Sequence, residues 1–374
     1  MRGKPGSHEN PGRRRKGRGA LGNPANRFDP REVEPFDDGW GSLEQELPPL
    51  ETIVTPETSR TIITRNDSPD IPFYQSINPY KGCEHGCVYC FARPTHAYLG
   101  LSPGLDFETR IFSKPAAAEL LEKELSGKGY RCRVIALGAN TDPYQPAERK
   151  LGISRRLLEV FAAFNHPVAI VTKSNLVLRD LDLLAPMAAR RLACVMISVT
   201  TLDPELARGM EPRAPAPRKR IDAIRTLSDA GVPAGVLASP MIPALNDSEL
   251  ERILEAAASA GARWAGYVLL RLPHEVKRIF TEWLEASHPL KAARVLMLVR
   301  ESHGGELYDS AFGSRMRGSG PYAQMLLRRF ETACRRLGLQ TGQPPLDASL
   351  FRVPDRLTGS GAGRVPGGQL PLLR

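Results

Sequence analysis

Between residues 70 and 290, short apolar runs alternate with amphipathic stretches, and this alternation limits the possible folds more than any other feature. The apolar runs, which we expect to form strands, are 73–79, 132–138, 167–172, 193–200, 233–239 and 264–271. The amphipathic stretches, which we expect to form helices, are 114–126, 152–164, 176–190, 218–230, 247–260 and 274–286. Six such units with nearly continuous apolar strands predict a parallel sheet covered by helices. The pattern alone leaves a barrel and a doubly wound open sheet as alternatives.

Three of the six cysteines lie close together after the first expected strand, at Cys83, Cys87 and Cys90. Their Cys-x3-Cys-x2-Cys spacing suits three irons of a [4Fe–4S] cluster, which normally takes four protein thiolates. One iron would then stay open for a small molecule. Two glycines within the loop allow it to wrap closely around the cluster. Tyr89 places an aromatic face beside the last cysteine.

A structural zinc site is the competing interpretation of these cysteines, with His85 or His96 as the fourth ligand. Zinc sites usually combine one close pair of cysteines with a second, distant pair. The remaining cysteines, Cys132, Cys194 and Cys334, are isolated from one another in the sequence. The spacing therefore favours the iron–sulfur cluster.

The stretch from Asn78 to Arg93 resembles the signature of the radical S-adenosylmethionine (SAM) superfamily. The resemblance implies a partial (β/α)6 barrel of the TIM type, with the cluster motif in the loop after the first strand, and so selects the barrel. It also implies that the open iron chelates the amino and carboxylate groups of SAM. An electron from the cluster would cleave SAM to methionine and a 5′-deoxyadenosyl radical, which abstracts hydrogen from the substrate. An external electron donor, such as flavodoxin or ferredoxin, would then be a partner.

Polar residues gather where the expected strands end, and in barrels of this kind the carboxyl ends of the strands carry the chemistry. These polar segments are 137–148, 171–175, 196–201, 239–246 and 269–273. The cationic Lys173 suits the carboxylate of SAM, and the hydroxyl of Ser198 suits its ribose or amino group. The Asn, Asp, Thr and Ser residues in these segments can also be read as ordinary helix caps or turn residues.

Within the superfamily, 141–148, 172–174 and Ser198 resemble the spore photoproduct lyase-like branch, often labelled "DNA repair photolyase". The likeness covers about residues 70–290. Carried over to this sequence, it implies that Lys173 and Ser198 contact SAM and that Tyr89 lies against it.

One departure from that branch concerns the hydrogen donor. The lyase uses a cysteine near the end of the second strand, whereas residues 138–142 here contain none. Cys132 lies at the start of that strand, at the opposite end of the barrel. Photoproduct reversal by the lyase mechanism is therefore not expected.

The formal net charge of +10 is concentrated at the two ends of the chain. Residues 1–20 carry +6 and residues 351–374 carry +3. Basic ends of this kind can bind nucleic acid through its phosphates, or they can serve only as solubilising tails. A further basic run, Arg213–Arg220, is read either as a loop facing the substrate or as a solvated connector.

Composition divides the chain into four parts. Residues 1–50 are rich in Gly, Pro and charged residues and predict a disordered tail. Residues 51–290 form the expected barrel, opening with two β-branched runs within 51–65 that we expect to pair as strands. Residues 291–354 predict a helical extension packed on the barrel, and 355–374 predict a flexible tail.

The remaining composition indicates a cytoplasmic enzyme. The chain is 41% hydrophobic and 25% charged, and its six cysteines do not form a disulfide framework. No apolar run is long enough for a membrane span, and no apolar segment follows the basic N-terminus as in a signal peptide. The substrate is either nucleic acid or, alternatively, a protein or small molecule. A non-catalytic iron–sulfur protein is a third possibility, but it would leave the polar strand ends idle.

Overall fold

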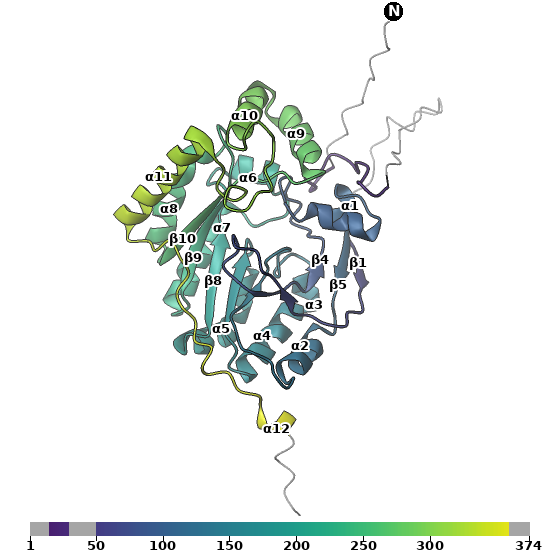
Figure 1. Ribbon diagram of the computed structural model, residues 1–374, viewed down its shortest axis with the longest axis vertical. Coiled ribbons are helices and arrows are strands. Elements are labelled where there is room, and N and C mark those ends of the chain that lie inside the picture. The colour runs from purple at the N-terminus through teal and green to yellow at the C-terminus, as the bar shows by residue number, and fades with distance from the viewer. Residues whose placement is uncertain (1–14, 30–49, 359–374) are drawn as a thin grey trace, which may run out of the picture.

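The computed structural model describes residues 15–29 and 50–358 (Figure 1). Large parts of the expected disordered tails, at 1–14, 30–49 and 359–374, lie outside these described residues. In the described part of the chain, no helix combines the length and the apolar character that crossing a membrane requires.

The main sheet has seven strands in the order β10-β9-β8-β7-β6-β3-β2. The strands are β2 (Thr64–Arg65), β3 (Gln75–Ile77), β6 (Ile135–Leu137), β7 (Val168–Thr172), β8 (Ala193–Ser198), β9 (Ala234–Met241) and β10 (Trp264–Leu269). All neighbours pair in parallel except β2, which is antiparallel to β3. The six expected strands are thus all present and ordered as in the chain. The prediction of a partial (β/α)6 barrel is confirmed, and within the described residues no strand pairing joins β10 to β2.

Helices follow each of the six expected strands, as predicted. They are α2 (Ala117–Leu125), α3 (Glu148–Leu151), α4 (Ile153–Ala163), α5 (Leu181–Ala189), α6 (Pro204–Met210), α7 (Pro217–Asp229), α8 (Leu250–Ser259) and α9 (Val276–Ser287). Two further helices are α10 (Pro289–Glu301) and α11 (Gly320–Leu337), and α11 packs against α8 (Figure 1). A short helix, α12 (Asp355–Thr358), begins the segment that was expected to be a flexible tail. The main core lies between helices and sheet, where Val168, Ile170 and Val195 are fully or almost fully buried against apolar helix residues such as Leu157 and Phe161.

The two runs within 51–65 form strands, but they do not pair with each other, so that prediction is wrong. β1 (Ile53–Pro56) pairs in parallel with β5 (Arg110–Ser113), which also pairs with β4 (Tyr80–Lys81) in a separate three-stranded sheet. The connection to β2 is buried only at its end, where Ile62 is 2% exposed and its N–H donates to the Glu124 carboxylate of α2 over 2.5 Å.

Residues 15–29 also differ from the expectation, because this part of the presumed disordered tail packs on the domain. Arg18 is 3% exposed and donates to the carbonyl of Glu108 over 2.9 Å. The N–H groups of Gly19 and Ala20 donate to the two carboxylate oxygens of Glu108, over 2.9 and 2.8 Å. Glu108 lies in the short helix α1 (Leu105–Thr109) and is itself fully buried. Composition could not reveal this one buried carboxylate as an anchor.

The segment between α10 and α11 connects the two edges of the main sheet. On one edge, the N–H of Leu269 in β10 donates to the carbonyl of Met316 over 2.9 Å. On the other, Arg315 pairs with Asp70 over 2.7 Å, in the turn between β2 and β3. The N–H of Gly313 donates to the same carboxylate over 2.8 Å. The polypeptide therefore crosses the lateral opening that the strands leave.

Candidate active site

The three clustered cysteines lie on the loop between β4 and the 3-10 helix η1 (Arg93–Leu99). Cys83 and Cys87 are buried, and Cys90 is partly buried. The loop bends at Gly86, whose φ of +68° favours glycine. A Cβ atom at Gly86 would also stand 2.7 Å from the carboxylate of Glu108. The tight course expected from the glycines is therefore required by both the backbone conformation and the neighbouring side chain.

The electrostatics of these thiols fit a metal cluster. Burial raises the pKa of Cys83, Cys87 and Cys90, and charge repulsion from Asp142 and from the other two cysteines raises the pKa of Cys83 further. Three thiolates this close and this buried need compensating positive charge, which the irons of a [4Fe–4S] cluster supply. The positive charge of Lys173 already favours the thiolate forms of Cys87 and Cys90 by lowering the pKa of each.

The zinc alternative fits less well, because the described residues bring no complete set of ligands together on one ion. Nδ1 of His85 lies 3.4 Å from the carboxylate of Asp142. Nε2 of His96 contacts the carbonyl of Arg110 at 2.9 Å, and its ring packs edge-on against Phe107. Within the described ranges, no three His, Cys, Asp or Glu side chains converge as they would on one ion. A [4Fe–4S] cluster asks for a different arrangement, since each thiolate binds a separate iron.

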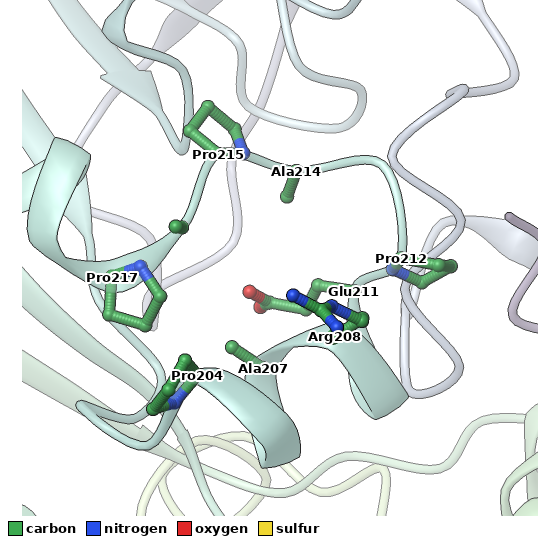
Figure 2. A pocket seen from close by; sticks show the side chains of 9 residues that line it. Pro204, Ala207, Arg208, Glu211, Pro212, Ala214, Pro215 and Pro217 are labelled. Atoms are coloured by element: carbon green, nitrogen blue, oxygen red, sulfur yellow. The ribbon is translucent and has the colours of Figure 1, made fainter.

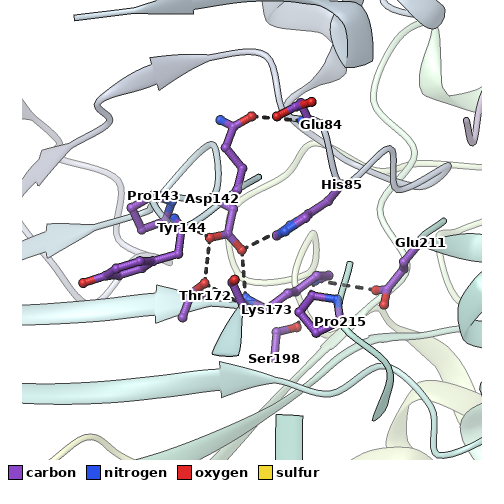
Figure 3. A network of polar contacts seen from close by, with 12 residues as sticks. Glu84, His85, Asp142, Pro143, Tyr144, Thr172, Lys173, Ser198, Glu211 and Pro215 are labelled. Carbon is purple, nitrogen blue, oxygen red and sulfur yellow. Dashed lines mark hydrogen bonds and ion pairs between the residues drawn. The ribbon is translucent and has the colours of Figure 1, made fainter. Parts of the chain in front are cut away.

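Asp142, which follows β6, joins the cysteine loop to the end of β7 (Figure 3). Its carboxylate accepts hydrogen bonds from the hydroxyl of Thr172 over 2.6 Å and from the N–H of Lys173 over 2.8 Å. Burial alone would raise the pKa of Asp142, but His85 and these hydrogen bonds outweigh it and lower the pKa to about 2. Asp142 is therefore a structural anion that orients the backbone at Lys173.

The three residues assigned to SAM by resemblance lie together in the structure. Nζ of Lys173 donates to Oγ of Ser198 over 3.0 Å, and it lies 5.7 Å from the centre of the Tyr89 ring. Lys173 follows β7, Ser198 ends β8, and Tyr89 comes from the cysteine loop between Cys87 and Cys90. One cation, one hydroxyl and one aromatic face thus stand beside the cysteines. Their role in binding SAM stays a prediction.

Glu211 completes this group, and sequence reasoning missed it. Its carboxylate is fully buried, accepts from Thr200 over 2.6 Å, and is hydrogen-bonded to the hydroxyl of Tyr89. It also pairs with Arg220 and lies 3.8 Å from Nζ of Lys173 (Figure 3). In the sequence, Glu211 directly follows the short helix α6 and not a strand. The only indication of its role in the sequence was that an acidic residue directly precedes the segment containing the basic run.

The basic run Arg213–Arg220 is neither wholly solvated nor wholly directed at a substrate. Arg220 is 1% exposed and bonded to Glu211, so it belongs to the framework of the site. Arg213 is exposed, but it lies 3.3 Å from the carboxylate of Glu84 in the cysteine loop. Of the four cations in the run, only Arg218 and Lys219 are exposed without such an ion pair among the described residues.

The cysteine loop is held from two other sides as well. Gln145, after β6, accepts from the N–H of Glu84 over 2.9 Å and donates to the carbonyl of Gly82 over 3.1 Å, so it bonds on both sides of Cys83. On the opposite side, the N–H of Val88 donates to the carbonyl of Met210 over 3.0 Å. These contacts fix the loop in the shape that places all three thiols.

A cavity of about 110 Å³ lies behind Glu211, between α6 and the loop that leads to α7 (Figure 2). Its lining consists mostly of Pro and Ala side chains with one cation, from Pro204, Ala207, Arg208, Glu211, Pro212, Ala214, Pro215, Ala216 and Pro217. None of the cysteines lines it, and neither does Lys173. The cavity therefore meets the group of residues described above at Glu211, but it does not reach the cysteines or Lys173.

Comparison with known proteins decides the family. The model of the radical SAM superfamily matches residues 77–257, which contain the three cysteines, Lys173 and Ser198. The chain belongs to the radical SAM superfamily. Membership implies an enzyme of the radical SAM type, with SAM and a [4Fe–4S] cluster as cofactors. The expected family is thus confirmed.

The relatives in sequence carry no assigned activity. An uncharacterized protein of Mycobacterium tuberculosis is 38% identical over 232 residues, covering 62% of this chain and 68% of the relative. An uncharacterized protein of Methanocaldococcus jannaschii is 31% identical over 174 residues, covering 46% and 62%.

Among solved structures, the fold resembles that of spore photoproduct lyase. One mutant of that lyase matches with a TM-score of 0.57 at 15% identity, covering 77% of this chain and 81% of the lyase. The same lyase complexed with a dinucleoside spore photoproduct matches with a TM-score of 0.56 at 15% identity and the same coverage. The likeness in fold expected for the lyase-like branch is therefore confirmed.

Proposed function

We propose that this radical SAM protein cleaves SAM reductively at a [4Fe–4S] cluster bound by Cys83, Cys87 and Cys90. The observation that carries the proposal is the convergence of the Lys173 ammonium, the Ser198 hydroxyl and the Tyr89 ring beside the cysteine loop. When bound, the cluster supplies the electron that cleaves SAM and so yields a 5′-deoxyadenosyl radical for hydrogen abstraction. That electron comes from an external donor such as flavodoxin or ferredoxin.

In this proposal each side chain holds one part of SAM. Lys173 pairs with the carboxylate, because a carboxylate in a buried site needs a charged partner. Ser198 donates to or accepts from the ribose or amino group, and its own second contact, to the carbonyl of Ser239 at 3.3 Å, keeps the hydroxyl in place. The ring of Tyr89 lies against the cofactor, held at its hydroxyl by Glu211.

The substrate is either nucleic acid or a protein or small molecule, and one observation favours nucleic acid. The likeness in fold to a lyase solved with a dinucleoside photoproduct supports a nucleic-acid substrate. The segment 138–142 after β6 nevertheless has no cysteine, and Cys132 precedes that strand. Hydrogen return by a cysteine at the strand end is therefore not part of the proposal. A protein or small-molecule substrate is the alternative.

The proposal is tested by anaerobic reconstitution followed by assay of iron, sulfide and 5′-deoxyadenosine. We expect about four irons per chain and SAM cleavage in the presence of dithionite. Cys87→Ala should lose both, whereas Cys334→Ala, which changes a buried thiol on the distant helix α11, should keep both. Retention of the cluster and of SAM cleavage in the variant Cys83→Ala, Cys87→Ala, Cys90→Ala would overturn the assignment.

A further inference from the structure

Arg271 stands at the carboxyl end of the last strand, two residues after β10. Its neighbours Leu270 and Leu272 are both fully buried, and they fix the backbone at this position. The guanidinium carbon lies 5.0 Å from the centre of the Phe91 ring. Phe91 directly follows Cys90, so Arg271 is held beside the cysteine loop.

The hydrogen-bonding capacity of Arg271 is almost unused. A guanidinium has five N–H donors. Nη1 lies 3.2 Å from the sulfur of Met316, which is a weak acceptor. Nε is buried and has no partner among the described residues. A buried donor without an acceptor is costly, by about 1–3 kcal/mol, and marks a position where a ligand can supply the acceptor.

Three arginines named above differ from Arg271, because each of them pairs with a carboxylate. Arg93, Arg220 and Arg315 pair with Glu108, Glu211 and Asp70. Arg271 has no carboxylate within ion-pair distance in the part of the chain that the structure describes. Its cation is thus oriented by an aromatic ring and a thioether, neither of which neutralises it. This arrangement leaves the charge open to an anion.

We propose that Arg271 binds an oxyanion of the substrate, a phosphate or carboxylate group, beside the cluster. Guanidinium groups bind both anions through paired, charge-assisted hydrogen bonds. The exposed face of Phe91, whose side chain is 41% exposed, would pack against the adjoining apolar part of the substrate. The inference rests on the proposed function, because it places the anion within reach of the cluster site.

The test uses inorganic phosphate and ¹³C-labelled acetate as probes with the full-length, reconstituted protein. The reduced cluster is paramagnetic, so it broadens the ³¹P or ¹³C resonance of an anion that binds nearby. We expect saturable broadening by the wild-type protein. Broadening of phosphate alone identifies a phosphate-bearing substrate, and broadening of acetate identifies a carboxylate. Failure to broaden either probe would overturn the inference.

Variants distinguish specific anion binding at Arg271 from nonspecific attraction by positive charge elsewhere on the protein. Arg271→Gln should weaken binding of the broadened anion about tenfold or more, and Arg271→Lys should weaken it less. The control Arg300→Gln removes an equal charge from the exposed face of α10 and should bind as the wild type does. Equal binding by Arg271→Gln and wild type would contradict the inference. So would a parallel loss of SAM affinity in Arg271→Gln, which would place Arg271 in the cofactor site.

A second readout distinguishes failure of this inference from failure of the proposed function. Calorimetric titration with phosphate and with acetate needs no cluster, so it reports anion binding even in protein that fails to assemble one. A wild-type protein that cleaves SAM but binds neither anion contradicts only the role of Arg271. A protein that binds an anion through Arg271 but assembles no cluster contradicts only the proposed function.

Discussion

The two ends of the main sheet differ in the kinds of side chain that pack there. At the carboxyl ends of the strands, Glu211 and Arg220 are buried and paired with each other, and the partly buried Asp142 accepts hydrogen bonds from Thr172 and Lys173. At the amino ends, the barrel interior is filled by apolar and aromatic side chains, among them Trp264 and Cys194. Buried charge is expensive and stabilises only when fully paired. We infer that the charge is concentrated where a cofactor has to be held, and that the other end supplies packing.

Breaking the buried pair at the carboxyl end should have the largest effect. Glu211→Gln leaves the charge of Arg220 without its partner, and both side chains are at most 2% exposed. We expect a loss of about 3–5 kcal/mol in the free energy of unfolding, measured by urea denaturation, together with weaker SAM binding. Glu205→Gln, which changes an exposed acid on α6, should stay within about 0.5 kcal/mol of wild type. An unchanged stability and SAM affinity in Glu211→Gln would refute the comparison.

At the amino ends of the strands, the corresponding test is a substitution that disturbs side-chain packing. A Cβ atom at Gly235 would stand 2.2 Å from the indole ring of Trp264, whereas one at Gly266 would meet only the end of a leucine side chain at 3.2 Å. Gly235→Ala should therefore lower the free energy of unfolding by about 1–3 kcal/mol, and Gly266→Ala by much less. Neither change should alter the affinity for SAM per folded molecule. A selective loss of SAM affinity in Gly235→Ala would show that the two ends are coupled.

The two ends should also lose stability in different pH ranges. At the amino end, His166 is buried, which lowers its pKa to about 4, so its contribution is present above about pH 6.5 and is lost as the pH falls toward 4. At the carboxyl end, the pKa of Asp142 is about 2, so its contribution is present above about pH 4 and is lost as the pH falls toward 2. Each contribution is on the order of 2–3 kcal/mol.

Variants assign these ranges to residues. In unfolding experiments from pH 7 to 2, His166→Gln should flatten the stability profile only between about pH 6.5 and 4, and Asp142→Asn only between about pH 4 and 2. If both variants flatten the same range, the assignment of the two pKa shifts to separate ends is wrong.

Features that depend on residues close together in the sequence could be predicted, and features that depend on contacts between distant segments could not. The six strands, the cysteine loop and the residues Lys173 and Ser198 depend on local periodicity and on motifs that span a few residues. Glu211 could not be predicted, because its role depends on partners that lie in other elements, such as Tyr89 and Arg220. The same holds for the anchoring of Arg18 at Glu108, which lies 90 positions later in the chain.

The smallest effect is expected from the charged ends. Deletion of 1–14 and 359–374 should leave iron content and SAM cleavage unchanged, and it should reduce the salt dependence of any binding to DNA, because fewer counterions are released. A longer deletion, of 1–20, removes Arg18 and the two N–H groups that bind Glu108 beside the cysteine loop, and should lower iron content. Equal iron content after both deletions would show that residues 15–20 do not support the loop.

The central claim is that the carboxyl end of the sheet holds SAM at the cluster, and it is tested most directly by electron–nuclear double resonance on the reduced protein with SAM labelled with ¹³C at the carboxylate. We predict hyperfine coupling between the cluster and the label in wild type and in Gly235→Ala. In Lys173→Ala, higher concentrations of SAM should be needed to reach the same coupling, with iron content intact. Absence of coupling in a wild-type protein that carries the cluster, or an unchanged SAM titration in Lys173→Ala, would contradict the account.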